Sequence, residues 1–450
     1  GLLGATPSAS PMLMGVGFIV GTRISAVLFS GAVMGWLLLV PLSVFLNPSL
    51  GTLIGPGETY TDLATAVWLQ QVRPLAVGTM IVAAFYTLWS LRQSLITGIG
   101  RALKNIGGGD GGEEPARTDV DLDLKKVLLA IGGTAIACFF LYYHFSGSVA
   151  GSMTLTVVMV ILGFLFAAVA GYLVGLIGSS NNPVSGLTLS ALLIAAVLMV
   201  LLGVTDVRGV AGVLGVAGVV CCAAAIAGDM MQDLKVGHIL GGTPWRMQIG
   251  ELVGVVFAAL VLTLSLVALH KVYVIGSAQL PAPQAGLMAL MANGIVAGEM
   301  AWPLVIGGMF FAVGLILIKA PAPMLIAVGM YLPFESTSAI FVGGLVKWIF
   351  ELALKKKGAT EEEKARAENT GILVSSGFIA GESLMAVFLA LLVIGADKFP
   401  ALVAFQNWNF MEAPSYYLSL IAYVIVLGML VWLPVSKMRS EGLPTTHLDH

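Results

Sequence analysis

The sequence places three carboxylates and one guanidinium within stretches that are otherwise apolar: Glu299, Glu335, Glu382 and Arg23. A charge at the centre of a bilayer costs about 3 kcal/mol or more, so we expect these groups to face a protein-lined cavity, either paired or protonated. A carboxylate whose pKa is raised by desolvation can bind and release a proton. The three glutamates are therefore candidates for proton coupling, and all four residues are candidates for binding a charged substrate.

Glu335 follows an interruption in an apolar segment. The stretch "PMLIAVGMYLPFESTSAIFVGG" (323–344) begins and ends like a membrane helix, but Pro333 lies in its middle. Proline removes a backbone donor and clashes with the preceding turn, so it breaks the helix. Glu335, Ser336 and Thr337 are then expected at the start of the next helix, where acidic and hydroxyl residues cap free N–H groups. These three residues are candidates for substrate binding, and a capping role alone is the other interpretation.

Glu299 and Glu382 end two similar hexapeptides, "GIVAGE" and "GFIAGE", whose glycines are four residues apart and allow close helix contacts. Each glutamate also has a structural interpretation. Glu382 could form a structural ion pair with Arg23 or Arg73, and Glu299 could be a carboxylate at a helix start.

The motif "SSNNPVSG" lies between two strongly apolar segments and contains Asn181 and Asn182. An asparagine side chain both donates and accepts hydrogen bonds, so both residues are candidates for substrate binding. A plain turn between two helices is the alternative, because the following proline and glycine favour turns.

The composition indicates an all-α polytopic membrane protein. Hydrophobic residues make up 58% of the chain and charged residues 10%, with a mean hydropathy of +0.97. A β-barrel would alternate apolar and polar residues instead. The net charge of −2 and the absence of a basic stripe predict no nucleic-acid partner. No cofactor is expected, and no metal site, because the three cysteines lie in apolar runs without the spacing of metal ligands.

Apolar spans and charged loops alternate along the chain. Shorter apolar pieces at about 11–22, 285–298 and 322–333 cannot cross the hydrocarbon alone, so they predict re-entrant segments or halves of discontinuous helices. Lysine and arginine are retained on the cytoplasmic side. This rule predicts a multi-pass protein of the inner (plasma) membrane whose cytoplasmic loops are 92–126, 229–248 and 355–370.

The pattern of spans, loops and repeats divides the chain into six parts. They are a first repeat element with its following span (1–91), a flexible cytoplasmic loop (92–126), a central helical bundle (127–284), a second repeat element with broken helices (285–354), a charged cytoplasmic loop (355–370), and C-terminal spans with a tail (371–450).

An internal repeat pairs residues 11–36 with residues 323–348 without a gap, and eight of 26 positions are identical. The repeat sets Arg23 opposite Glu335. Because the first copy is separated from the predicted cytoplasmic loop by one further span and the second copy is not, the two copies are predicted to be inverted. Inverted repeats with broken helices are typical of secondary transporters, which bind substrate and coupling ion near the middle of the membrane.

Several motifs resemble the oligopeptide transporter family, whose relatives include the yellow stripe-like metal-chelate transporters. They are "GDMMQDLKVGHILGGTPWRMQIGE" (228–251), "NNPVSG" (181–186), "NGIVAGEMAWPLVIG" (293–307), residues 323–344 and "SGFIAGESL" (376–384). The likeness covers about residues 10–435. The stretch "GHILGGTPWRMQ" resembles prokaryotic members more closely than the plant chelate transporters. Family members usually extend further at the N-terminus, so the chain resembles the C-terminal two-thirds of a member.

The resemblance implies proton-coupled symport of small peptides or siderophore-like metal chelates by alternating access, with no enzymatic activity. The expected partners are such a substrate, protons and the lipid bilayer, and a homodimer is left open. A channel-like pore is the alternative, although a channel would favour a symmetric array over an inverted pair. An intramembrane hydrolase is a weaker alternative, because HExxH and a membrane-embedded GxGD motif are both missing.

Overall fold

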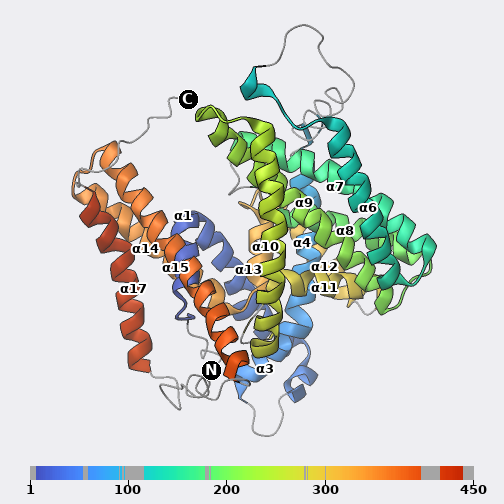
Figure 1. Cartoon of the computed structure of the whole chain (residues 1–450). Coiled ribbons are helices and arrows are strands. Elements are labelled where there is room, and N and C mark those ends of the chain that lie inside the picture. The colour runs from blue at the N-terminus through green and yellow to red at the C-terminus, as the bar shows by residue number, and fades with distance from the viewer. Residues whose placement is uncertain are drawn as a thin grey trace. The chain divides into compact units, whose positions relative to one another are not determined.

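The computed structural model describes residues 7–53, 59–90, 92–93, 96, 116–177, 182, 184–277, 280, 282–298, 301–396 and 416–438 (Figure 1). Within these residues every regular element is helical. The elements are α1 (Pro11–Ala32), η1 (Val33–Leu39), α2 (Val40–Leu46), η2 (Pro48–Leu53), α3 (Tyr60–Val67), η3 (Trp68–Val72), α4 (Arg73–Ser90), η4 (Arg117–Asp119), α6 (Leu124–Ser146), α7 (Val149–Ile177), α8 (Val184–Leu201), α9 (Val207–Ile239), α10 (Pro244–Tyr273), α11 (Pro283–Ala292), η6 (Asn293–Ala297), α12 (Trp302–Leu317), α13 (Pro323–Tyr331), α14 (Phe334–Lys356), α15 (Glu361–Ala396) and α17 (Tyr416–Lys437).

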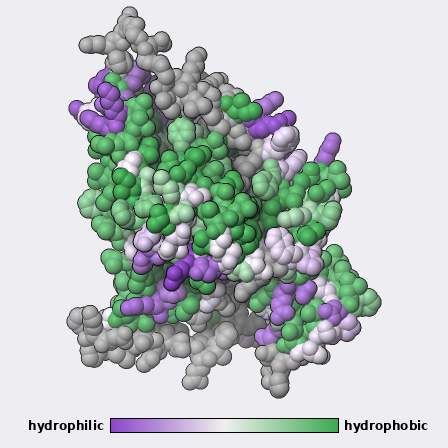
Figure 2. Space-filling view, turned by 90° about the vertical axis from the view of Figure 1, so that its right-hand side faces the viewer, coloured by the Kyte–Doolittle hydropathy of each residue, from purple (hydrophilic) through white to green (hydrophobic). Residues whose placement is uncertain are grey.

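The helices have the length and composition of membrane spans. In the described part of the chain, nine helices are long and apolar enough to cross a bilayer. Large hydrophobic side chains remain exposed along α6, α10 and α15, and apolar residues cover much of the face seen in Figure 2. Such exposure is expected where lipid, not water, surrounds a helix. The all-α polytopic fold predicted from composition is therefore confirmed.

Two predicted loops are largely helical. Residues 229–248 were expected to form a polar loop, but α9 continues to Ile239 and α10 begins at Pro244, leaving a short turn. Residues 355–370 are similar, because α14 ends at Lys356 and α15 begins at Glu361. Hydropathy ends a span at the membrane surface, whereas the backbone hydrogen bonding of a helix continues into water, so both loops were predicted too long.

The chain forms two compact units. Unit 1 comprises residues 1–80, 265–281 and 304–450, and unit 2 comprises residues 81–264 and 282–303. In unit 2, α7, α8 and α9 pack together, and α6 packs on α7 and α9. In unit 1, α1 packs on α13, α14 and α15, and α15 packs on α17. Unit 1 contains both copies of the predicted repeat.

The first copy of the repeat is a helical hairpin, and its first half runs in the same direction as α14. α1 bends at Gly21, whose φ of 82° lies in the left-handed region that glycine tolerates. The carbonyl of Met14 lies directly against Gly343. Further along both helices, Phe18 packs on Phe350 with ring centroids 5.4 Å apart.

Beyond the bend, the second half of α1 runs in the opposite direction to α14. Ser25 Oγ lies directly against Gly344, and Phe29 contacts first Phe341 and then Phe334, at ring-centroid distances of 4.5 and 5.8 Å. These contacts move back towards the start of α14. The two halves of α1 therefore run in opposite directions, so residues 11–36 form a helical hairpin whose second half continues into η1 and α2.

The second copy repeats this arrangement with the roles exchanged. α13 runs in the same direction as the second half of α1, because Ile326 lies against Gly31 and Met330 against Gly35. After Pro333 the chain reverses into α14. The corresponding long halves of the two copies thus run in opposite directions, and the predicted inverted repeat is confirmed.

Reciprocal glycine contacts establish the symmetry of the two copies. A Cβ added to Gly17 would lie 1.9 Å from the carbonyl oxygen of Ile340, and one added to Gly329 would lie 1.9 Å from that of Leu28. Gly329 and Ile340 are the repeat equivalents of Gly17 and Leu28. Only glycine allows the backbones to approach so closely.

The hydroxyls beside the two breaks are also equivalent. Ser25 Oγ donates to the carbonyls three and four residues earlier, and Thr337 Oγ1, at the same repeat position, does the same. The sequence had predicted that Thr337 caps the free N–H groups of α14. Thr337 donates to two carbonyls instead, so this prediction is wrong. A buried hydroxyl near a proline break finds its acceptor among the carbonyls of the preceding turn.

Candidate functional site

Glu382 lies against the N-terminus of α1. Ser10 is the N-cap of that helix and accepts the backbone N–H of Leu13 at 3.2 Å. Its hydroxyl donates to Glu382, at 2.8 Å from Oε1 and 3.0 Å from Oε2, and the backbone N–H of Met12 donates to Oε2 at 2.8 Å. A half-buried carboxylate from the middle of α15 thus occupies the positive end of a half-helix.

The structural alternative proposed for Glu382 is wrong. Among the described residues it makes no ion pair with Arg23 or Arg73. Its charge is stabilised by a hydroxyl and a backbone N–H instead, which are the groups that a helix N-terminus offers to an anion.

The N-terminus of α14 lies beside that of α1. The backbone N–H of Ser8 donates to the carbonyl of Glu335 at 3.1 Å, and the hydroxyl of Tyr423 donates to the carbonyl of Ser8 at 2.9 Å. Because the first half of α1 and α14 run in the same direction, their positive ends meet here. Glu335 and Glu382 are therefore brought to the same end of the paired hairpins.

The structure separates Arg23 from Glu335. Arg23 lies next to Thr22, which donates to the carbonyl of Gly344 at 2.9 Å. Gly344 is nine residues beyond Glu335 along α14, a rise of about 13 Å. Both charged side chains are exposed and Ser336 is half-buried, while Thr337 is buried. The prediction that Arg23 and the carboxylates share one enclosed cavity is not met by this arrangement.

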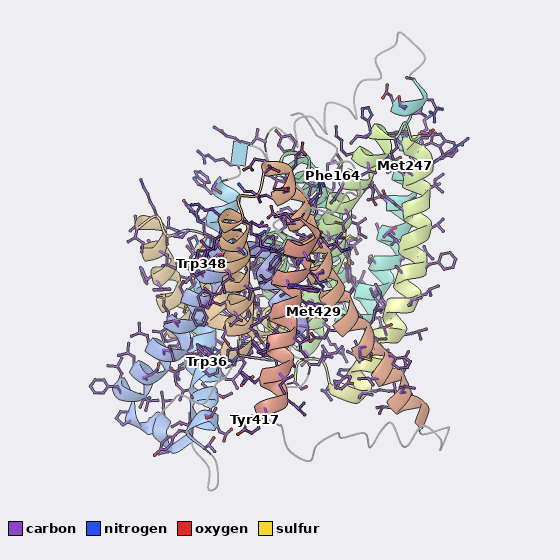
Figure 3. All side chains as sticks on the ribbon, turned by 90° about the vertical axis from the view of Figure 1, so that its left-hand side faces the viewer. Trp36, Phe164, Met247, Trp348, Tyr417 and Met429 are labelled. Carbon is purple, nitrogen blue, oxygen red and sulfur yellow. The ribbon has the colours of Figure 1, made fainter. Side chains whose placement is uncertain are left out.

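The second helix break is held by two tryptophans. Trp36 Nε1 donates to the carbonyl of Leu332 at 3.2 Å, and Trp68 Nε1 donates to the carbonyl of Met330 at 2.9 Å. The indole rings stack with centroids 4.7 Å apart. The C-terminus of α13 leaves carbonyls without helical partners, and these two N–H groups satisfy them. Figure 3 labels Trp36 and its repeat equivalent Trp348, which lies higher in that view.

Arg73 lies in the same cluster. Its guanidinium carbon is 4.2 Å from the ring centroid of Tyr331 and 5.2 Å from that of Trp68, and its Nη2 donates to the hydroxyl of Tyr331. Tyr331 is the last residue of α13 and is buried. The guanidinium of Arg73 therefore packs against two aromatic rings at the C-terminus of α13, which is the negative end of that helix.

Another cation, Lys347, is buried in the second half of α14. Lys347 is 7% exposed and forms an ion pair with Glu368, with Glu351 4.0 Å away. Its ammonium group is 5.2 Å from the ring of Phe18 and 5.3 Å from that of Phe350. A cavity of about 350 Å³ adjoins the pair. This cluster joins α14 and α15 to the first half of α1.

The remaining candidates belong to unit 2 or lie outside the described residues. Asn182 donates to the carbonyl of Ala224 at 3.2 Å, and its Oδ1 is buried without a partner. Asn182 also fills the space beside Gly228, where an added Cβ would lie 2.6 Å from its Nδ2. Asn182 therefore contacts α9, and neither the binding interpretation nor the turn interpretation is tested by these contacts. Asn181 and Glu299 lie outside the described residues.

Comparison with known protein families places the chain. The family model described as "OPT oligopeptide transporter protein" matches residues 4–393. The chain belongs to this family. Membership in the OPT family makes the protein a transporter with a multi-pass membrane fold, not an enzyme.

The OPT chain has relatives among bacterial, fungal and plant proteins. A Haemophilus influenzae protein named "Putative oligopeptide transporter" is 29% identical over 440 residues, which cover 88% of this chain and 68% of the relative. A Saccharomyces cerevisiae protein with the same description is 26% identical over 38% of this chain and 25% of its own length. A rice protein named "Probable metal-nicotianamine transporter" is 24% identical over 40% of this chain and 26% of its own length. No solved structure matches.

Sequence reasoning missed the aromatic cluster of this OPT protein. Its members come from three separate segments of the chain, around Trp36, around Trp68 and Arg73, and at Tyr331, and no sequence pattern brought these segments together. A weak signal existed, because Trp36 is one of the identical positions of the repeat. Among the described residues, no group of three His, Cys, Asp or Glu side chains is placed to hold a metal ion.

Proposed function

We propose that this OPT-family chain carries out proton-coupled symport of small oligopeptides or metal chelates by alternating access across the plasma membrane. The observation that supports this most strongly is the pair of reciprocal glycine contacts, Gly17 with Ile340 and Gly329 with Leu28. Two interlocked hairpins of opposite direction have equivalent packing from either side. Rocking of one such element against the other exposes a central site to each side in turn.

The substrate class follows the names of the relatives. Two relatives are named as oligopeptide transporters and one as a metal-nicotianamine transporter. Peptides and such chelates both carry carboxylate and amine groups, so one polar site could serve either class. The proposed substrate-binding residues of unit 1 are Arg23, Glu335, Ser336, Thr337 and Glu382, and those of unit 2 are Asn181, Asn182 and Glu299.

Among the proposed proton-coupling carboxylates, Glu382 has the strongest structural support. It is half-buried within a membrane-spanning helix and accepts hydrogen bonds from Ser10 and Met12. Protonation would remove the charge that the N-terminus of α1 stabilises and would weaken both bonds. Proton binding at Glu382 would thereby loosen the first hairpin from α15. Glu335 is exposed and has no comparable link to a moving element, and Glu299 remains a candidate.

Reconstituted protein in liposomes tests the proposal. Tri-alanine and a metal–nicotianamine complex are offered with and without an inwardly directed proton gradient, while a pH-sensitive dye reports the lumen. A symporter shows saturable uptake that requires the gradient and acidifies the lumen in proportion to substrate. Uptake at the same rate with and without the proton gradient contradicts proton coupling. A current that does not saturate with substrate supports the channel instead.

A further inference from the structure

Arg73 is placed by an irregular helix segment. η3 is a π-helix, and the backbone N–H of Arg73 donates to the carbonyl of Trp68, five residues earlier. A π-turn brings residues five apart onto one face, which is why Trp68 and Arg73 both face the end of α13. Single π-turns inside α-helices occur often at functional sites. Trp36 reaches the same place from a second π-helix, η1.

The backbone around Arg73 is fixed before any ligand binds. The carbonyls of Met330 and Leu332 already accept the indole N–H groups of Trp68 and Trp36. The guanidinium therefore has no part in satisfying those two carbonyls. Its planar face rests on Tyr331, and stacking on an aromatic ring leaves the edge N–H groups of a guanidinium available for an anion.

The charge of Arg73 is uncompensated. It makes no ion pair with any carboxylate in the part of the chain that the structure describes, and its Nε is buried without a hydrogen-bond partner. A guanidinium with a buried N–H group and no partner is costly unless an anion joins it.

We propose that Arg73 is a binding residue for a carboxylate of the transported substrate. The planar guanidinium matches a carboxylate through parallel N–H···O bonds, and Trp68 and Tyr331 form apolar walls around the pair. This inference rests on the proposed function and adds the substrate group that the site recognises. The competing explanation is that Arg73 only stabilises the C-terminus of α13 through its charge.

A matched pair of probes separates the two explanations. Tri-alanine and its C-terminal amide differ in one carboxylate, and acetate and acetamide differ in the same way. Binding is measured on the purified chain with ¹⁵Nε-labelled arginine, and the Arg73 signal is identified by its loss in Arg73→Lys. We expect acetate and tri-alanine to shift the Arg73 signal saturably and the two amides to leave it in place.

Affinity gives the second readout. The free peptide should bind about tenfold to hundredfold more tightly than its amide, because hydrogen bonds to charged groups are strong. Arg73→Gln should reduce that ratio to about threefold or less. Arg92→Gln is the matched control, since Arg92 also contacts a tryptophan, with its guanidinium carbon 5.0 Å from the ring of Trp89, but is exposed. The ratio of free-peptide to amide affinity should stay unchanged in Arg92→Gln.

The outcomes are distinct. An Arg73 signal that acetate and tri-alanine fail to move overturns the proposal. Acetate binding without discrimination between peptide and amide also overturns it, because the anion site would then be unrelated to substrate. If Arg73 binds the carboxylate but the liposomes show no proton-driven uptake, the site stands and the symport proposal fails.

Discussion

Phe29 and Phe341 stack face to face, with ring centroids 4.5 Å apart and planes 4° apart. They occupy the same position in the two copies of the repeat, 312 residues apart in the chain. A residue that contacts its own equivalent must lie next to the axis that relates the copies. The approximate two-fold axis therefore passes between these two rings, and both hairpins are arranged about it.

Close packing about this axis predicts that equivalent glycines lose similar amounts of stability when each is replaced by alanine. Gly17→Ala and Gly329→Ala should each lower the free energy of unfolding by about 1–3 kcal/mol or more, since the added Cβ meets a backbone carbonyl that cannot move aside. Gly132→Ala in α6 is the control, because nothing lies within 4 Å of its added Cβ. It should be neutral or stabilising by up to about 1 kcal/mol. Denaturant titration in detergent measures all three, and a large effect at only one of the paired glycines would contradict the symmetry.

The proposed role of Glu382 predicts a selective transport defect. Glu382→Gln keeps an acceptor oxygen for Met12 but cannot titrate, so uptake driven by a proton gradient should fall about tenfold or more, while exchange of labelled for unlabelled substrate continues. Glu335→Gln should have the smaller effect.

Glu361→Gln is the control for this substitution, because Glu361 lies at the exposed start of the same helix. Gradient-driven uptake at the wild-type rate by Glu382→Gln would remove Glu382 from the coupling mechanism.

Inversion of the two copies predicts opposite sidedness for their ends. In a background without the native cysteines, Asn47→Cys follows the long half of the first copy and Lys357→Cys follows that of the second. A membrane-impermeant maleimide should label Asn47→Cys from outside intact cells and Lys357→Cys only after permeabilisation, as the cytoplasmic assignment of 355–370 requires. Labelling of both from one side would refute the inverted arrangement.

The buried ion pair of Lys347 predicts non-additive stability changes. Glu368→Gln leaves a buried ammonium without its partner and should destabilise unit 1 by about 1–3 kcal/mol, a value reduced because Glu368 is 52% exposed. Adding Lys347→Met should recover part of the loss, since a methionine fits the apolar surroundings. The exposed Lys364–Glu361 pair is the control, and Glu361→Gln should change stability by less than about 0.5 kcal/mol. A double variant less stable than Glu368→Gln alone would contradict the assignment.

The hydrogen bonds of Asp62 predict that the stability of the first turn of α3 depends on pH. The backbone N–H and the hydroxyl of Thr59 both donate to its carboxylate at 2.8 Å, and these bonds lower the pKa of Asp62. A depressed pKa stabilises the folded helix start above the ordinary aspartate range, and the contribution is lost as pH falls through the lowered pKa. Amide hydrogen exchange at the first turn of α3 should therefore lose protection in acid, after correction for intrinsic rates. Asp62→Asn should show no such acid-dependent step.

Much of this architecture could be predicted from residue patterns. Apolar runs of about 20 residues can be stable only in a bilayer, so composition determined the polytopic helical class. The gapless match between 11–36 and 323–348 and the lysine-rich loops predicted two inverted copies, and Pro333 predicted the break in the second. The first break was harder to locate, because glycine at position 21 permits a reversal without requiring one.

The tertiary structure decided which polar groups meet. Glu382, Ser10 and Met12 come together because α15 packs beside the first half of α1, and Arg73 joins Tyr331 because a π-turn rotates it towards α13. Neither event leaves a local signal, since each depends on contacts between segments more than 200 residues apart. The sequence by itself thus determined that charges lie within membrane helices, because that depends only on hydropathy along the chain. The partners of those charges were decided by helix packing, which depends on close backbone contacts at glycines such as Gly17 and Gly329.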